Sequence, residues 1–227
     1  MREIAIDTET TGLSPFNGDK IVEIGCVEMI NHVPTNNVFH RYINPQRDVP
    51  EEVVKIHGIT EEFLKDKPIF SAIADEFLAF IGSDTLVIHN AAFDMSFINA
   101  ELAAINKEPI DMGRVIDSLA IARRKFPGDK ANLDSLCKKF GIDNSHRTKH
   151  GALLDAELLS EVYLELVGGR EPGLAMTTLQ KKSPEVAAAV KTEARPERFF
   201  PASEEELKEH RDFLLSKLKD PVWNKLS

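Results

Sequence analysis

The sequence predicts an α/β domain with a mixed five-stranded sheet flanked by helices, followed by a flexible tail that carries a short helix. Three strand-like segments come first and are separated by short gaps, which favours antiparallel pairing. Helical and strand-like segments then alternate, which is typical of an α/β sheet. The last 58 residues differ from this pattern, because prolines interrupt them repeatedly, as in a linker.

The elements are predicted in chain order from hydrophobic periodicity. Small and β-branched side chains predict strands, and a loop rich in glycine, proline and asparagine separates the first two of them. The five predicted strands cover residues 2–8, 20–31, 38–44, 85–88 and a short segment around 115–116. Apolar residues at helical spacing predict helices over residues 73–81, 92–105, 117–125, 132–139 and 152–167.

The tail contains one predicted helix. Ser203 is a favourable N-cap residue, and Glu206 three positions later completes a capping box. Leu207, Leu214 and Leu218 share one face of this helix. A short amphipathic helix after a linker cannot bury its apolar face alone, so we expect it to fold back or to dock on a partner. The predicted boundaries are 1–168 for the domain, 169–202 for the linker and 203–227 for the helix and C-terminus.

Composition and charge exclude several classes of protein. No apolar run approaches the ~18 residues of a membrane span, the first residues lack a signal-peptide profile, and two cysteines cannot build a disulfide scaffold. We therefore expect a cytoplasmic protein without membrane contact. The net charge of −9 argues against a DNA-coating role. Residues 114–149 nevertheless carry nine basic and four acidic side chains, which either contact phosphates or simply solvate helix surfaces.

Four carboxylates stand beside apolar residues that predict a core. Asp7 and Glu9 are two residues apart at the end of the first strand, so their side chains share one face. Asp94 lies at the start of the helix after the fourth strand, and Asp155 lies on the apolar face of the helix over 152–167. Any one of them alone is more often paired with a helix end or an arginine. Together they predict a site for Mg²⁺ or Mn²⁺, because both ions prefer oxygen ligands.

This cluster predicts phosphoryl-transfer chemistry. Two divalent cations about 4 Å apart can activate a water and stabilise a leaving oxygen. His150 precedes Asp155 by five residues, just ahead of the helix, and a histidine there is a suitable general base.

Three motifs resemble those of the DEDDh exonuclease family. Their order and spacing fit over residues 1–168. The third motif, together with His57-Gly58-Ile59-Thr60, is most similar to the branch whose members proofread for bacterial replicative DNA polymerases. The three motifs are Asp7-Thr8-Glu9-Thr10-Thr11-Gly12, His89-Asn90-Ala91-Ala92-Phe93-Asp94 and His150-Gly151-Ala152-Leu153-Leu154-Asp155-Ala156.

The resemblance implies an RNase H-like fold and 3′→5′ removal of nucleotides as 5′-monophosphates. It implies that Asp7 bridges two divalent cations, that Glu9 and Asp155 complete the ligands of one, and that Asp94 holds the other. His150 matches the general base of the family. Mispaired DNA ends would be selected because a frayed end reaches the site at lower cost. Substrate contacts are implied, with base stacking for Phe93, at Asp7, Glu9, Thr10, Gly12, Leu13, Glu52, His57, Phe93, His150 and Asp155.

The resemblance also implies partners and leaves alternatives. The tail helix and Trp223 would tether the domain to the catalytic (alpha) subunit of the polymerase. Leu174 and Met176 would bind the sliding clamp, although the stretch lacks the glutamine expected at its start. The tail is otherwise an extension without a partner. An exonuclease that trims RNA 3′ ends would share all five catalytic positions, and a third hypothesis is an interaction subunit without catalytic activity.

Overall fold

A five-stranded mixed sheet organises the chain up to residue 168 in the computed structural model, which describes residues 1–145, 147, 149–168 and 202–217. The spatial order is β3-β2-β1-β4-β5. β1 pairs antiparallel with β2, β2 pairs antiparallel with β3, and β4 and β5 run parallel to β1. The predicted mixed sheet is confirmed. The strands are β1 Arg2–Thr10, β2 Ile21–Ile30, β3 Val33–Tyr42, β4 Thr85–Ile88 and β5 Val115–Asp117.

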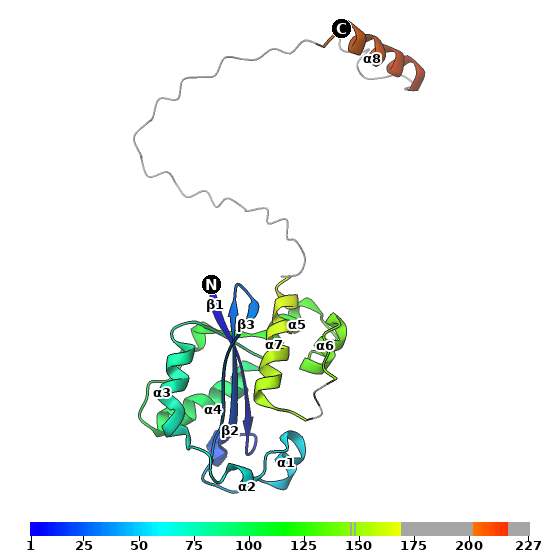
Figure 1. Ribbon diagram of the computed structural model, residues 1–227. Coiled ribbons are helices and arrows are strands. Elements are labelled where there is room, and N and C mark those ends of the chain that lie inside the picture. Colours follow the sequence, from blue (N-terminus) through cyan, green and yellow to red (C-terminus); the bar gives the residue numbers. More distant parts are fainter. Residues whose placement is uncertain (146, 148, 169–201, 218–227) are drawn as a thin grey trace, which may run out of the picture. The chain divides into compact units, whose positions relative to one another are not determined.

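Helices cover both faces of this sheet (Figure 1), with α3 and α4 on one side and α5, α6 and α7 on the other. The predicted helices are present within one or two residues at most ends, apart from the first. The helices of the domain are α1 Glu51–His57, α2 Glu61–Leu64, α3 Phe70–Ile81, α4 Ala91–Ala104, α5 Ser118–Lys125, α6 Leu133–Phe140 and α7 Ala152–Leu166, with 3₁₀ turns η1 Pro15–Asn17 and η2 Met112–Arg114.

The structure differs from the prediction at three places. α1 and α2 were not predicted, because seven and four residues are too few to show a helical period. β3 begins at Val33, five residues before the predicted start, because its polar first half pairs with the end of β2. α7 ends at Leu166, and the left-handed Gly168 donates its N–H to the Glu165 carbonyl at 3.1 Å.

Alternating side chains of β1 bury into two separate cores. Ile4 and Ile6 pack with Phe77 of α3 and Phe97 of α4. Ala5 faces the opposite side and packs with apolar residues of α6 and α7. Because β1 is central and buried on both faces, the carboxylates at its end face helices instead of open solvent.

The tail helix α8 Glu204–Lys217 forms a unit of its own. Its predicted capping box is present, since the Glu206 carboxylate accepts from the Ser203 N–H at 2.8 Å and the Ser203 hydroxyl accepts from the Glu206 N–H at 3.3 Å. Leu207 is 47% exposed on this helix and Phe213 is 54% exposed. The proposed linker, the clamp-binding stretch, Leu218 and Trp223 lie outside the described residues.

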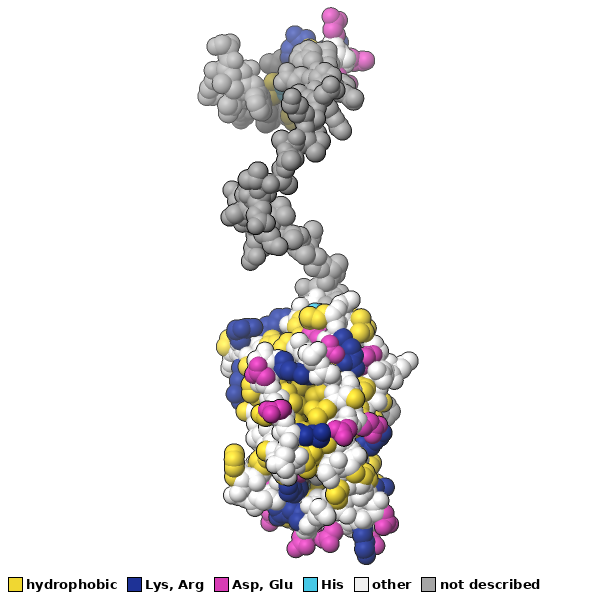
Figure 2. Space-filling model, turned by 90° about the vertical axis from the view of Figure 1, so that its left-hand side faces the viewer, with side chains coloured by type: hydrophobic (Ala, Val, Ile, Leu, Met, Phe, Trp, Pro, Cys, Tyr) yellow, Lys and Arg dark blue, Asp and Glu magenta, His cyan; other side chains and the backbone are white. Residues whose placement is uncertain are grey.

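Among the residues that the structure describes, no helix has the length and apolar character that crossing a membrane requires. Figure 2 shows that acidic and basic side chains are interspersed on the face of the domain that it displays. Charge alone therefore does not mark this face as a nucleic-acid-binding surface.

Candidate active site

The carboxyl end of β1 carries the first two candidate ligands. Asp7 and Glu9 lie on the face of β1 that Ala5 buries against α7, as the period of two predicts. In the ladder Asp7 stands opposite Gly25, and Glu9 stands opposite Glu23 of β2. The end of β1 thus presents carboxylates to the beginning of α7.

Two residues of β2 let α7 approach these carboxylates. A Cβ atom on Gly25 would lie 2.3 Å from the backbone of Ala152 and Leu153, so only glycine fits where the helix begins. Glu23 is 3% exposed, and its Oε2 accepts from the Ala152 N–H at 3.1 Å. A carboxylate at this point is favoured by the positive end of the helix. Gly25 and Glu23 therefore fix α7, and with it Asp155, beside Asp7.

Asp94 reaches the site from the other face of the sheet. It is 4% exposed in the first turn of α4, and its Oδ1 accepts from the Thr8 hydroxyl at 2.7 Å and the Thr8 N–H at 3.1 Å. Thr8 alternates with Asp7 and Glu9 on β1, so one short strand orients Asp94 and carries two other carboxylates.

Asp155 and His150 meet at the start of α7. Asp155 is 3% exposed, whereas the side chain of His150 is 48% exposed. The Nδ1 atom of His150 lies 3.2 Å from Asp155 Oδ2. Arg147 contacts both residues. Its Nε lies 2.6 Å from Asp155 Oδ1, and its Nη2 lies 2.7 Å from Asp155 Oδ2 and 2.6 Å from His150 Nδ1.

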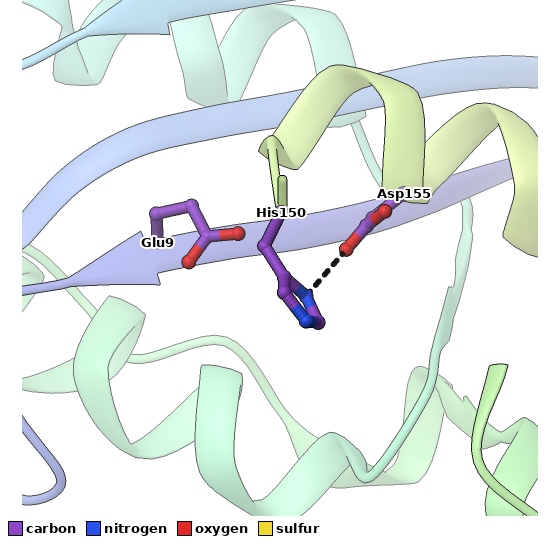
Figure 3. A group of neighbouring side chains, drawn as sticks. All are labelled: Glu9, His150 and Asp155. Atoms are coloured by element: carbon purple, nitrogen blue, oxygen red, sulfur yellow. Dashed lines mark hydrogen bonds and ion pairs between the residues drawn. The ribbon is translucent and has the colours of Figure 1, made fainter. Parts of the chain in front are cut away.

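A cavity of about 280 Å³ lies against Asp7, His150 and Asp155, whereas Glu9 and Asp94 do not line it. Its lining includes Asp7, His89, Asp134, Arg147, His150 and Asp155. Potential ligand atoms of Glu9, His150 and Asp155 all lie within 4.8 Å of one another (Figure 3). Carboxylate oxygens at this density, with an imidazole beside them, form a donor set that fits a divalent cation of the Mg²⁺ or Mn²⁺ type.

The electrostatics of the carboxylates fit the same conclusion. Burial raises the pKa of Asp7 well above its ordinary value, and the charges of Asp94, Asp155 and Glu9 raise it further. Burial is also the main cause that raises the pKa of Glu9 to about 8 and that of Asp94 to about 7. The charged forms of these groups are therefore unfavourable without a cation, and a divalent ion would restore them.

The other predicted substrate contacts differ in their exposure. Leu13 is 84% exposed, whereas Thr10 is buried and donates its hydroxyl to the Gly12 carbonyl at 2.6 Å. Glu52 is exposed in the first turn of α1. Phe93 is partly buried, with its ring centroid 5.0 Å from that of Phe97, so less of its ring is open for base stacking than the sequence implied.

His57 and Gly12 are held by the protein itself. His57 is 6% exposed, and its Nδ1 accepts from the Ile59 N–H at 3.0 Å. Burial lowers the pKa of His57, which favours the neutral ring. A Cβ atom on Gly12 would lie 2.3 Å from the Asp19 carboxylate, so this position requires glycine for close packing.

Sequence reasoning did not select five residues that shape the site. Thr8, Glu23 and Gly25 act on residues far away in the sequence, whereas the partners of Arg147 lie 3 to 13 residues from it. His89 lines the cavity and is held by Ser118, with its Nδ1 2.9 Å from the hydroxyl oxygen. The signal that was available for Arg147 was the excess of basic residues over 114–149.

Comparison with known proteins places this site in a family. The exonuclease family model matches residues 4–163. DNA polymerase III subunit epsilon of Rickettsia felis is 50% identical over 225 residues, which cover 96% of this chain and 98% of the relative. The corresponding subunit of Escherichia coli is 49% identical over 176 residues, covering 74% of this chain and 72% of the relative.

A solved structure gives the same result for the fold. Exonuclease X in complex with 5′ overhanging duplex DNA matches with a TM-score of 0.60 and 27% identity, over 74% of this chain and 92% of that chain. The nuclease domain of 3′hExo, a DEDDh family member, matches with a TM-score of 0.65 at 17% identity over 74% and 92% of the two chains, which supports the RNase H-like fold alone. The chain therefore belongs to the exonuclease family, in the group formed by the DNA polymerase III epsilon subunits.

Proposed function

We propose that this protein is the 3′→5′ exonuclease that removes mispaired 3′-terminal nucleotides from DNA as the proofreading subunit of a replicative DNA polymerase. The observation that carries the proposal is the convergence of carboxylates from three elements, with His150 just before α7: Asp7 and Glu9 on β1, Asp94 on α4 and Asp155 on α7. The similarity to the epsilon subunits supports the substrate and the polymerase, and with them a cytoplasmic location. An RNA-trimming exonuclease is the alternative that the active site does not distinguish.

The four carboxylates would hold two divalent cations, Mg²⁺ or Mn²⁺. The charges of Glu9, Asp94 and Asp155 all act on Asp7, which suits a ligand shared by both ions. Glu9 and Asp155 would complete one ion's ligands, and Asp94, oriented by Thr8, would hold the second. When bound, the ions supply positive charge that activates a water and stabilises the leaving oxygen.

His150 would be the general base. Its side chain is half-exposed at the cavity, within reach of a water that attacks the terminal phosphodiester. The imidazole takes a proton from that water while the bond between phosphorus and the 3′ oxygen breaks. The product is a nucleoside 5′-monophosphate.

The loop after β1 and the helix α1 would hold the end of the strand. Leu13 is exposed in the loop after β1 and would offer an apolar contact to the terminal base. Thr10, Gly12, Glu52, His57 and Phe93 would supply further contacts. Mispaired ends would react faster because their unpairing costs less free energy.

The tail would provide the polymerase contact. We propose a domain over residues 1–168, a linker over 169–202 with a clamp contact at Leu174 and Met176, and a tether over 203–227 for the alpha subunit. The capped α8 with its exposed Leu207 and Phe213 supports a docking helix. Truncation after Gly169 should leave nuclease activity and abolish co-purification with the polymerase subunit; unchanged co-purification would exclude the tether.

A gel assay tests the catalytic proposal. DNA primers labelled at the 5′ end, paired or mispaired at the 3′ end, and an RNA of matched sequence are incubated with Mg²⁺, Mn²⁺ or EDTA. We expect metal-dependent shortening of DNA that is faster at the mispair. Shortening of RNA with little cleavage of DNA would favour the RNA-trimming enzyme, and no cleavage would favour the interaction subunit.

A further inference from the structure

Arg147 makes four polar contacts with side chains that line the cavity. It lies in the segment between α6 and α7, and its side chain is 7% exposed. Nε and Nη2 bind the two Asp155 oxygens at 2.6 and 2.7 Å, and Nη1 lies 2.9 Å from Asp134 Oδ1. Nη2 also lies 2.6 Å from His150 Nδ1. A single guanidinium therefore contacts the proposed metal ligand Asp155, the proposed general base His150 and a third side chain, Asp134.

The first consequence concerns Asp155. Both of its oxygens face the guanidinium in the bidentate geometry that arginine forms with carboxylates. A divalent cation that takes Asp155 as a ligand needs one of these same oxygens. The positive charge of Arg147 acts on Asp7, Glu9 and Asp155. It would therefore also repel a cation that binds among these carboxylates. Arg147 and the cation therefore compete for one carboxylate.

The second consequence concerns His150. The guanidinium has only donors, so the Nδ1 atom of His150 must accept from Nη2. A neutral imidazole that accepts at Nδ1 carries its proton on Nε2 and has no free lone pair there. The ring gains a basic Nε2 only when Nδ1 instead carries a proton, which it can donate to Asp155 Oδ2 at 3.2 Å.

We propose that Arg147 is a positioning residue that acts as the internal counter-cation of the metal-free site, competing with the incoming divalent cation for Asp155 and holding His150 in the tautomer whose Nε2 is not basic. This inference rests on the proposed function, because it assumes that Asp155 binds a metal. Asp134 gives the released guanidinium a place to remain, since it is 48% exposed and already paired with Nη1. Arrival of the cation would thus free Asp155 and His150 in one event.

Binding of Mn²⁺ to the full chain tests the competition. Titration calorimetry compares wild type with Arg147→Gln and with Lys149→Gln, which removes an exposed positive charge two residues away in the sequence. We expect Arg147→Gln to tighten the Mn²⁺ dissociation constant about tenfold, within the usual range for coupling between two ligands. Lys149→Gln should change it much less.

The outcomes separate this inference from the proposed function. Absence of Mn²⁺ binding by wild type would contradict the proposed function itself. If wild type binds Mn²⁺, unchanged or weaker binding by Arg147→Gln overturns the competition, and so does equal tightening by Lys149→Gln. Should Arg147→Gln not fold, Arg147→Lys replaces it, because lysine keeps the charge without the bidentate contact; it too must bind Mn²⁺ more tightly than wild type.

The tautomer of His150 gives a readout that a purely structural arginine would not change. Nitrogen-15 shifts of the His150 ring are recorded on the full chain in EDTA and with Mg²⁺, which is diamagnetic. We expect the proton on Nε2 in EDTA and on Nδ1 with Mg²⁺, and on Nδ1 in both conditions for Arg147→Gln. The same tautomer in both conditions for wild type would overturn this part of the proposal.

Discussion

The carboxylates at the two ends of one face of β1 have different kinds of neighbour. Glu3 is fully buried at the first end, where the Tyr163 hydroxyl donates to its Oε1 at 3.0 Å and His32 Nδ1 lies 2.7 Å from its Oε2. Asp7 and Glu9, four and six residues later on the same face, have mostly other carboxylates as neighbours. At the first end a hydroxyl and an imidazole lie beside the carboxylate, whereas at the second end we propose that a cation binds.

This difference separates Glu3 from the two acids that we propose to bind a cation, Asp7 and Glu9. All three residues interrupt an apolar environment, but Glu3 is fully buried, whereas Asp7 and Glu9 are partly exposed. They also differ in the identity of the nearest partner, since a dedicated hydroxyl stabilises a fold and a second carboxylate destabilises it. Helix α7 links the two ends, because Tyr163 lies near its last turn and Asp155 lies in its first.

The largest effect should come from removing the bridging ligand. Asp7→Ala should lower the rate of DNA 3′ shortening by more than about 10³-fold, the size expected for loss of a principal catalytic group. Its melting temperature in EDTA should stay equal or rise, because repulsion among the carboxylates falls. Glu3→Gln should do the reverse, with a lower melting temperature and nearly normal activity. Retained turnover by Asp7→Ala would contradict the two-metal assignment.

The second largest effect should come from a substitution where α7 packs against β2. A methyl group in Gly25→Ala would meet the Ala152 backbone at 2.3 Å, so α7 must shift away from Asp7. We expect a loss of roughly 1–3 kcal/mol in the free energy of unfolding and a fall in activity of about 10²-fold from misplaced Asp155 and His150. Denaturant unfolding and the gel assay measure the two quantities.

The matched control for this change is Gly113→Ala. An added methyl there meets only the exposed side chain of Asp111, at 3.1 Å. Its stability and activity should remain close to wild type. Equal losses in the two variants would mean that glycine flexibility, and not the fit of α7, is what matters.

These contacts also mark the limit of what the sequence could predict. Asp7 and Glu9 were predictable from a strand period of two, and Asp155 from its place on an apolar helix face, because both signals are local. Glu23 and Gly25 were not, since they act on Ala152 more than 120 residues away. Arg147 was counted among the basic residues, but its partners depend on how α7 packs.

The secondary-structure elements were likewise predictable only where the local signal was strong. Long periodic segments such as α3 and α4 were predictable within a few residues, whereas α1 and α2 were not, although α1 carries Glu52 and His57. Part of the basic character of residues 114–149 turned out to be structural. Arg114 donates to the Gly82 carbonyl at the end of α3, and Lys125 donates to the Leu166 carbonyl at the end of α7.

The cation itself should reverse the pH dependence of stability. The pKa values of Glu9, about 8, and Asp94, about 7, lie above their ordinary values near 4, so the folded chain holds these protons more tightly than the unfolded chain. Their contribution is complete below about pH 4 and is lost as the pH rises through 7 and 8. The melting temperature in EDTA should therefore fall between pH 5.5 and about 8.5 for this reason.

Mn²⁺ should oppose this loss, because it binds the deprotonated carboxylates. At a hundred times its dissociation constant, the ion should add about 2.7 kcal/mol to the free energy of unfolding. Melting curves from pH 5.5 to about 8.5, with and without Mn²⁺, measure both effects. Asp7→Ala should flatten the profile in EDTA and respond less to Mn²⁺. A metal-free profile that rises with pH would mean that the cluster is already compensated by the protein.

The smallest effect should come from the structural end, with Tyr163→Phe. Burial of Tyr163, and its hydrogen bond to Glu3, raise the pKa of the phenol, so the hydroxyl stays a donor at all ordinary pH values. Its removal leaves Glu3 with His32 as neighbour, and the cost should be about 1 kcal/mol, or roughly 2–4 °C in melting temperature. The rate of DNA shortening should stay within about twofold of wild type, because Asp155 is two helical turns away and is fixed separately by Glu23 and Gly25. A large loss of activity with normal stability would show that the two ends are coupled through α7, and Glu3 would then be part of the active site.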